Sequence, residues 1–253
     1  MTTTVVQARL PLADPHDCTD VADALTVLDA LYDPLLRRVP GGFAPALATG
    51  WTVSDDARHW TFTLRRDVRF HDGTAFDAEA AAMSLRRMAS PEMGATLGAP
   101  GVYAQYLGGA RITAAGTDRL VIDLDAPMAD LPDVLCYGYI IAPDALAAPR
   151  TSASGTGPWR MTAVSEDSVA AEAVPGHHDG PPRHQALRWQ RLPDAAARLD
   201  ALAVGKAQVA GLLPFDAAAP EGCTLHAYTD PMAVIFLFNP SRPARPTRAS
   251  AAR

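Results

Sequence analysis

The sequence predicts an α/β fold, because strand-like and helix-like patterns of apolar residues alternate along its 253 residues. The clearest strand pattern covers residues 60–64, where Trp60, Phe62 and Leu64 alternate with polar residues as on a half-buried strand. A clear helical pattern follows, in which Asp77 is placed to cap a helix whose apolar residues recur every three or four positions.

The other elements follow from the same two periodicities and from the turn residues that bound them. Strands are expected at 4–12, 68–70, 112–114, 120–124, 137–142, 160–164, 168–174, 187–192, 225–228 and 232–238. Helices are expected at 20–32, 77–90, 127–135 and 194–204. The first of these helices would be capped by Thr19 or Asp20, with Val21, Leu25, Leu28 and Tyr32 on one face.

Composition and charge exclude several classes of protein. Hydrophobic residues make up 48% of the chain and charged residues 20%, which is ordinary for a globular protein. The net charge of −6 gives no electrostatic reason to expect nucleic acid as a partner. No apolar run approaches the roughly 20 residues of a membrane helix, so direct membrane insertion is not expected. The start of the chain shows no signal peptide, which leaves open whether it begins at the mature part or is not exported.

The three cysteines are few and far apart, without the spacing of a metal or redox motif. We expect Cys18, Cys136 and Cys223 to be small buried hydrophobic residues, and a single disulfide stays open for an exported protein.

No pattern in the sequence predicts catalysis or a resident cofactor. A nucleophile elbow, an HExxH motif and a dinucleotide fingerprint are all missing from the sequence. The glycine-rich run 155–158 lacks the lysine of a phosphate loop, and a tight crossover between lobes, where small residues let backbones approach, is the better interpretation. His177, His178, Asp179 and His184 invite a metal site. Because this spacing lies on no helix or strand that would fix it, a solvated loop without metal is favoured.

Three segments resemble one protein family. Residues 51–79, WTVSDDARHWTFTLRRDVRFHDGTAFDAE, resemble the hallmark segment of the extracytoplasmic solute-binding proteins of ABC importers, family 5 (cluster C), which take up peptides and nickel. LYDPLL at 31–36 and GTGPW at 155–159 resemble two further signatures of that family. FDAEAAA at 76–82 is most similar to the nickel-binding branch.

The resemblance implies a class II periplasmic-binding-protein-like fold whose second lobe is missing. A mixed-sheet main lobe would comprise residues 1–45 and 151–239, with an inserted α+β subdomain at 46–150. The resemblance ends near Asn239, and the Ala/Arg/Pro/Ser-rich tail 240–253 is expected to be disordered. A truncation or a shifted reading frame near Pro243 is expected to account for the end of the resemblance.

The resemblance also implies where ligand would bind. In the family the segment after the first helix reaches the ligand cleft, which implicates the tyrosine, acid and proline at 32–34; alternatively, the acid merely ends a helix ahead of proline. The tyrosines at 103 and 106 would line the cleft or cover core edges. The tyrosine at 139 replaces an arginine that holds the chelator's carboxylate in the nickel branch. The predicted ligand-binding residues are Tyr32, Asp33, Pro34, Tyr103, Tyr106 and Tyr139.

The function that the resemblance implies is the solute-binding component of an ABC importer. Its ligand would be a small peptide or a metal chelate, its partners ABC permease subunits, and its location periplasmic. Two alternatives stay open, a cytoplasmic ligand-sensing module and a non-functional remnant of such a protein. A lobe without its second wall leaves a cleft and a sheet edge uncovered, so weak or no ligand binding and a tendency to associate are expected.

Overall fold

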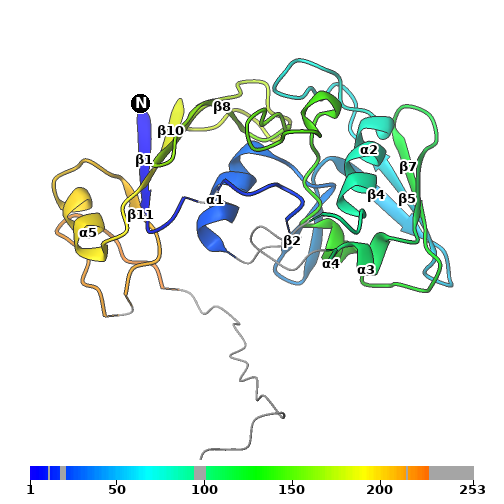
Figure 1. Cartoon of the computed structure of the whole chain (residues 1–253), viewed down its shortest axis with the longest axis horizontal. Helices are drawn as coiled ribbons and strands as arrows, with labels where there is room; N and C mark the ends of the chain where they lie inside the picture. Colours follow the sequence, from blue (N-terminus) through cyan, green and yellow to red (C-terminus); the bar gives the residue numbers. More distant parts are fainter. Residues whose placement is uncertain (11, 18–20, 94–100, 215, 228–253) are drawn as a thin grey trace, which may run out of the picture. The chain divides into compact units, whose positions relative to one another are not determined.

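The computed structural model describes residues 1–10, 12–17, 21–93, 101–214 and 216–227 (Figure 1). The chain divides into two compact units, Met1–Cys223 and Thr224–Arg253. The described residues of the second unit, 224–227, carry no helix or strand, so the strand predicted from Leu225 is wrong in its described part. Leu225 is half exposed, and a strand needs a neighbour with which to pair its backbone. The predicted strand 232–238 and the tail lie outside the described residues.

A five-stranded mixed sheet joins the start of the chain to its later part. β1 (Thr2–Gln7) runs parallel to β10 (Ala186–Arg191) on one side and to β11 (Val209–Ala210) on the other. β9 (Ser168–Ala173) pairs antiparallel with β10 and with β8 (Trp159–Val164), which gives the order β11-β1-β10-β9-β8. The mixed sheet confirms the predicted α/β class.

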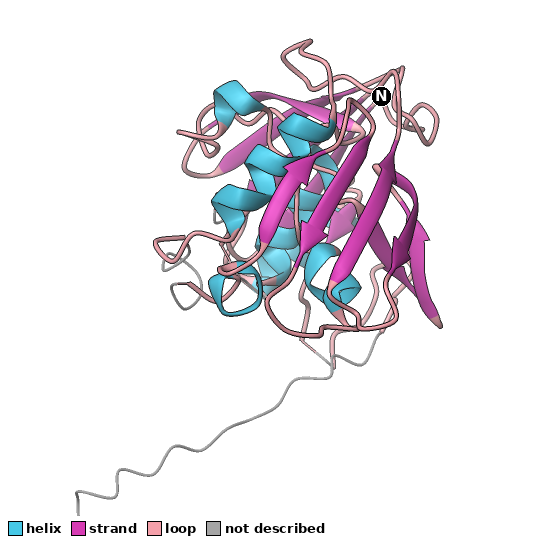
Figure 2. Ribbon diagram, turned by 90° about the vertical axis from the view of Figure 1, so that its right-hand side faces the viewer, coloured by secondary structure: helices cyan, strands magenta, loops and turns pink. Residues whose placement is uncertain are grey.

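A second, four-stranded sheet is antiparallel throughout. Its order is β4 (Ala48–Val53), β5 (His59–Leu64), β7 (Arg119–Asp123) and β6 (Arg111–Ala114), and these strands face the viewer in Figure 2. Every second side chain of β5 is buried, as its apolar alternation predicts. The two sheets draw on the ranges assigned to the main lobe and to the inserted subdomain. That division stays a prediction, because one hydrophobic core runs through both.

Helix α2 (Ala78–Met88) packs against β6 and β7 with its alanine-rich face buried. The carboxylate of Asp77 accepts a hydrogen bond from the Ala80 amide at 2.9 Å, so the predicted cap is confirmed. The two arginines of the last turn lie where the helix dipole favours positive charge.

Short elements complete the described chain. The other helices are α1 (Ala22–Leu31), α3 (Ala104–Leu107), α4 (Leu131–Leu135), η1 (Pro143–Ala145) and α5 (Ala195–Ala203), and β2 (Leu36–Val39) pairs with β3 (Gly42–Pro45). Asp194 caps α5 and Gly205 follows it at φ +72°, as predicted. The residue before α1 is Val21, and the caps predicted for this helix lie outside the described residues.

Three predictions of secondary structure need correction. Residues 68–70 form a single bridge, Arg69 to Ala75, because the chain reverses at once through Gly73 at φ +90°. Residues 138–142 are buried as predicted, whereas Tyr137 is exposed; the segment forms no strand, since its amides bond to scattered partners such as the Asp33 carbonyl and the Ser84 hydroxyl. The face of α1 that packs inward is centred on residues 24, 27, 28 and 31, one position away from the predicted stripe.

The glycine-rich run crosses the C-terminal end of α1 at very short range, so the predicted close approach of backbones is found, although α1 belongs to the same predicted main lobe. A Cβ built on Gly155 would lie 2.3 Å from the Leu31 carbonyl oxygen. A Cβ on Gly157 would lie 2.6 Å from the Ala30 carbonyl oxygen and from the Tyr32 amide nitrogen. Only a residue without a side chain fits at either position, so these glycines fix the distance between α1 and β8.

A buried histidine joins the segment before α1 to α2. His16 is fully buried; its Nε2 donates to the Tyr139 carbonyl at 3.0 Å, and its Nδ1 accepts from the Arg87 guanidinium at 2.9 Å. The same guanidinium pairs with Asp14 at 2.6 Å. These partners fix the neutral ring with its proton on Nε2. Burial and then the Arg87 charge lower the pKa of His16 to about 4.

Replacing Gly157 with alanine should destabilise the fold by about 3 kcal/mol, because the new methyl group forces two backbone segments apart. Gly176→Ala is the matched control: nothing lies within 4 Å of its Cβ position and its φ is not positive, so the change should stay within about 0.5 kcal/mol. Urea unfolding measures both. Equal stability of the two variants would show that the crossover tolerates a side chain.

His16 should make the protein less stable in mild acid. Its folded-state pKa of about 4 lies below the ordinary 6.5, so between these values the unfolded chain binds the extra proton. Stability should therefore fall as the pH falls from 6.5 to 4, by up to about 1.4 kcal/mol per pH unit from this residue. In His16→Gln the profile should be shallower by that amount, whereas His184→Gln, at an exposed histidine, should keep the wild-type slope. Parallel profiles for His16→Gln and wild type would refute this assignment.

Candidate functional site

A cleft of about 540 Å³ opens beside the C-terminal end of α1. One side is formed by the last turn of α1 and the start of β2, and the other by the start of β8 and the loop 177–182. The lining carries both signs of charge together with large aromatic surfaces. Its charged and aromatic side chains include Asp29, Arg37, Arg38, Tyr137, Trp159 and Asp179.

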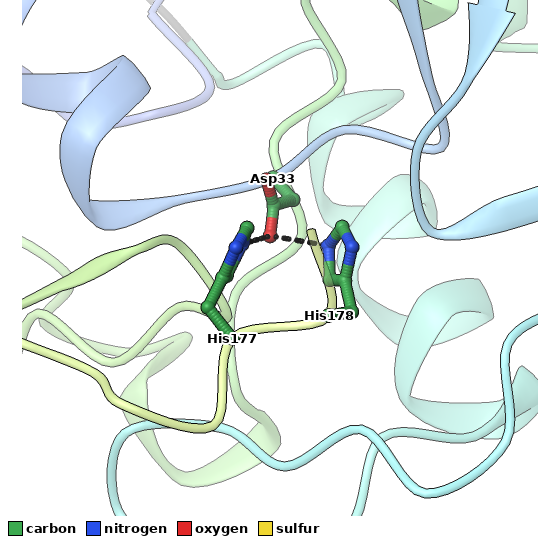
Figure 3. Close-up of side chains that lie close together, drawn as sticks. All are labelled: Asp33, His177 and His178. Carbon is green, nitrogen blue, oxygen red and sulfur yellow. Dashed lines mark hydrogen bonds and ion pairs between the residues drawn. The ribbon is translucent and has the colours of Figure 1, made fainter. Parts of the chain in front are cut away.

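A single buried carboxylate organises the floor beneath this cleft. The side chain of Asp33 is 1% exposed. Its Oδ1 accepts from the Arg37 guanidinium at 2.6 Å, and its Oδ2 accepts from the Thr156 hydroxyl at 3.1 Å. The Nε2 atoms of His177 and His178 lie 3.2 and 3.0 Å from the same Oδ2, and both rings point at it (Figure 3). The carboxylate thus ties together the α1 end, β2, the glycine crossover and the histidine loop.

The histidine loop is held in place by its own turns and by Asp179. The His177 amide bonds to the Val174 carbonyl and the Gly180 amide to the His177 carbonyl, with Gly180 at φ +96°. The Asp179 carboxylate contacts Arg37 at 2.5 Å and the Nδ1 of His178 at 3.0 Å. Two consecutive histidines can therefore turn their rings to the same atom, with ring centres 4.2 Å apart.

Electrostatics keep Asp33 ionised. Burial alone would raise the pKa of this carboxyl group. The hydrogen bonds from His177 and His178, together with the electrostatic attraction of the two rings, outweigh the effect of burial and hold the pKa well below its usual range. For Asp29 burial prevails over the hydrogen bond from Tyr139, so its pKa lies above the usual range.

The structure places the predicted ligand-binding residues in different surroundings. Tyr32 and Pro34 line the cleft, whereas Asp33 lies buried between them and does not. Tyr103 is buried and Tyr106 is exposed at α3, and neither belongs to the lining. Tyr139 is also buried, and its hydroxyl donates to Asp29 at 2.5 Å.

The prediction of a solvated loop around the two histidines is wrong. The His177 and His178 side chains are only 4% and 6% exposed, because they pack over Asp33. His184 does not join them; its ring contacts the Thr3 hydroxyl at 2.9 Å. Sequence reasoning also missed Arg37, Arg38, Tyr137 and Trp159 as lining residues, although two adjacent arginines after LYDPLL were a visible signal.

The model of the bacterial extracellular solute-binding proteins, family 5 (middle region), matches residues 42–246. The chain belongs to this family. The glutathione-binding protein GsiB of Salmonella choleraesuis (strain SC-B67) is 30% identical over 229 residues, which are 85% of this chain and 42% of that protein. The nickel-binding periplasmic protein of Escherichia coli (strain K12) is 51% identical over 57 residues, 22% of this chain and 11% of that protein. This family 5 chain thus spans about two fifths of the length of GsiB.

Solved structures show the same fold. The periplasmic binding protein DppA from Helicobacter pylori, in complex with the peptide STSA, matches with a TM-score of 0.70 at 20% identity, over 84% of this chain and 47% of that chain. The predicted periplasmic-binding-protein-like fold and the resemblance to family 5 are confirmed. No helix in the described ranges is long and apolar enough to cross a membrane.

Asp33→Asn should destabilise the protein by about 3 kcal/mol, since it breaks a buried ion pair while Arg37 keeps Asp179. Because the pKa of Asp33 is depressed, this difference should be complete above pH 4, where the carboxylate is ionised in both states, and should shrink as acid protonates it. Chemical unfolding at several pH values measures it.

Asp133→Asn is the control for this experiment, because it breaks an exposed pair with Arg38. It should cost less than about 1 kcal/mol. A loss of stability no larger for Asp33→Asn than for Asp133→Asn would contradict the organising role of the buried carboxylate.

Proposed function

We propose that this chain supplies one wall of the ligand site of a family 5 solute-binding protein that delivers small peptides to an ABC importer. The observation that carries the proposal is the cleft beside α1, in which opposite charges and aromatic faces stand together. A short peptide carries an ammonium group, a carboxylate and side chains, and each finds a matching surface there. Ligand sites combine mostly apolar lining with a few convergent polar groups in this way.

The charges of the cleft are available to a ligand to different degrees. The Arg37 and Asp179 side chains are 40% and 38% exposed, although they pair with each other. Arg38 is 53% exposed and pairs with Asp133 at the surface. A ligand carboxylate can therefore displace Asp133 from Arg38, because an exposed ion pair is weak. Tyr137 is also exposed and offers a flat apolar face to the ligand.

The alternative ligand, a metal chelate, is less well supported. In the nickel branch an arginine at the position of Tyr139 would hold the chelator's carboxylate. Here that position is a buried tyrosine whose hydroxyl is bonded to Asp29, so it offers no positive charge to the cleft. The nickel-like segment 76–82 enters α2 on the scaffold side and does not line the cleft.

The location and the partners that we propose for this chain follow from its family. Family 5 proteins are extracellular, and their ABC permease partners would dock on the complete protein. We propose the same setting for this chain, with a second wall opposite the cleft closing over the ligand by a hinge motion. A ligand held by one wall alone should bind weakly, because less of its surface leaves water.

The test is thermal unfolding of the purified chain with di- and tripeptides at millimolar concentration and, separately, with nickel–histidine. Peptide at ten times its Kd should stabilise the folded state by about 1.4 kcal/mol and raise the midpoint by about 3–6 °C. Tyr137→Ala and Arg38→Ala should each abolish that shift. Tyr106→Ala removes an equally exposed tyrosine that does not line the cleft, and it should retain the shift. A shift with nickel–histidine alone would replace the peptide by a chelate, and no shift with either ligand would contradict the proposal.

A further inference from the structure

The cluster of Asp33, His177 and His178 has the composition of a metal site. One carboxylate oxygen and two imidazole nitrogens all lie within 4.8 Å of one another. Zinc binds imidazole nitrogen and carboxylate oxygen at about 2.0–2.2 Å, so two ligand atoms on one tetrahedral ion stand roughly 3.3–3.6 Å apart. The Nε2 to Oδ2 separations of 3.2 and 3.0 Å are a few tenths of an ångström shorter, so a small opening of the cluster admits the ion. The three side chains also converge from two segments that are far apart in sequence (Figure 3).

The hydrogen bonds around His178 point to a cation at its Nε2. Its Nδ1 lies 3.0 Å from an Asp179 oxygen, and a carboxylate can only accept, so Nδ1 carries the ring proton. The Nε2 of the same ring lies 3.0 Å from the Oδ2 of Asp33. Two electron-rich atoms at this distance need a proton or a metal ion between them. A carboxylate on the outer nitrogen is also the arrangement that orients metal-bound histidines.

His177 completes the pair of nitrogen ligands. Its Nδ1 accepts a long hydrogen bond from the Asp179 amide at 3.3 Å, and its Nε2 faces Asp33. A metal at Nε2 would move the ring proton to Nδ1, so the Asp179 amide would lose this long hydrogen bond and the loop would have to shift slightly there. Both rings are nearly buried, which limits their contact with water.

A second cavity of about 320 Å³ reaches this cluster from outside the peptide cleft. His177, His178 and Thr156 lie in its lining, so an exogenous ligand can complete the coordination from that side. The lining also carries Arg65 and Arg66, and these positive charges favour an anion such as chloride or hydroxide as that further ligand. Of the charges near the carboxylates, Arg37 pairs with both Asp33 and Asp179, and Arg65 lies 3.5 Å from Asp179.

We propose that Asp33, His177 and His178 form a binding site for one borderline transition-metal ion, such as Zn²⁺, Ni²⁺ or Co²⁺. Two imidazoles and one carboxylate suit these ions, whereas Mg²⁺ and Ca²⁺ prefer oxygen ligands alone. The ion would clamp the histidine loop to the end of α1 and so hold the floor of the cleft rigid. The site shares His177 with the lining of the cleft, but metal binding is measured without peptide and so does not depend on the peptide assignment.

The experiment is calorimetric titration of the full chain, with any affinity tag removed, using ZnCl₂, NiCl₂ and MgCl₂ in turn. Zinc and nickel should bind with a stoichiometry of one, and magnesium should not bind. His178→Gln and His177→Gln should each weaken zinc binding at least tenfold, and Asp179→Asn should weaken it by about 10–100-fold through loss of orientation. The control is His59→Gln, which breaks an exposed histidine–carboxylate pair with Asp123 and should leave zinc binding unchanged.

A measurement on the wild type keeps the test independent of variant folding. X-ray absorption at the zinc edge should show two imidazole ligands at about 2.0–2.1 Å. Failure of zinc and nickel to bind would overturn the site and mean that a proton bridges His178 and Asp33. Binding that survives both histidine variants, or a spectrum with fewer than two imidazoles, would also overturn it. Peptide stabilisation is measured separately, so either proposal can fail alone.

Discussion

The ionised carboxylate of Asp33, buried at the end of α1, is the interaction on which the rest of the site depends. A buried charge is costly unless its partners satisfy it. Here one arginine, one threonine and two histidines converge on the two oxygens; the arginine lies four residues from Asp33 in the sequence, whereas the threonine and the histidines lie more than a hundred residues away. Satisfying one carboxylate thus fixes the positions of β2, the crossover and the histidine loop together.

Close backbone approach is the second constraint, and it acts at the same place. Gly155 and Gly157 let the crossover touch the last turn of α1, where a Cβ would overlap the backbone. That contact delivers Thr156 to Asp33 and places Trp159 at the cleft. The glycines and the carboxylate therefore support one geometry: the glycines permit the approach, and the hydrogen bonds make it specific.

The sequence predicted those parts of the fold that depend on local periodicity. The alternation in β5, the Asp77 cap, the hairpin of β6 and β7 and the glycine crossover each follow from neighbouring residues. The family followed from motifs in the same segments. Residues 137–142 were mistaken for a strand because burial makes a continuous apolar run, whichever partners the backbone finds.

The site was predicted less completely, because its contacts join distant parts of the chain. His177 and His178 looked solvated when considered with their sequence neighbours, since the acid that buries them lies at position 33. The resemblance predicts Asp33 as a ligand-binding residue, whereas the structure buries it beneath the residues that line the cleft. Its partners at 177 and 178 have no local signature, and only the folded chain brings them to it.

Nitrogen-15 NMR of the histidine side chains in the metal-free chain at neutral pH tests this account most directly, because it reads which ring nitrogen carries each proton. The geometry predicts a proton on each ring nitrogen that faces a carboxylate: Nε2 of His177 and of His178 toward Asp33, and Nδ1 of His178 toward Asp179. Two distinct sets of imidazole nitrogen signals, with ring protons that exchange slowly with water, would agree with two buried histidines held by Asp33. Averaged signals typical of freely rotating, solvent-exposed imidazoles would contradict it.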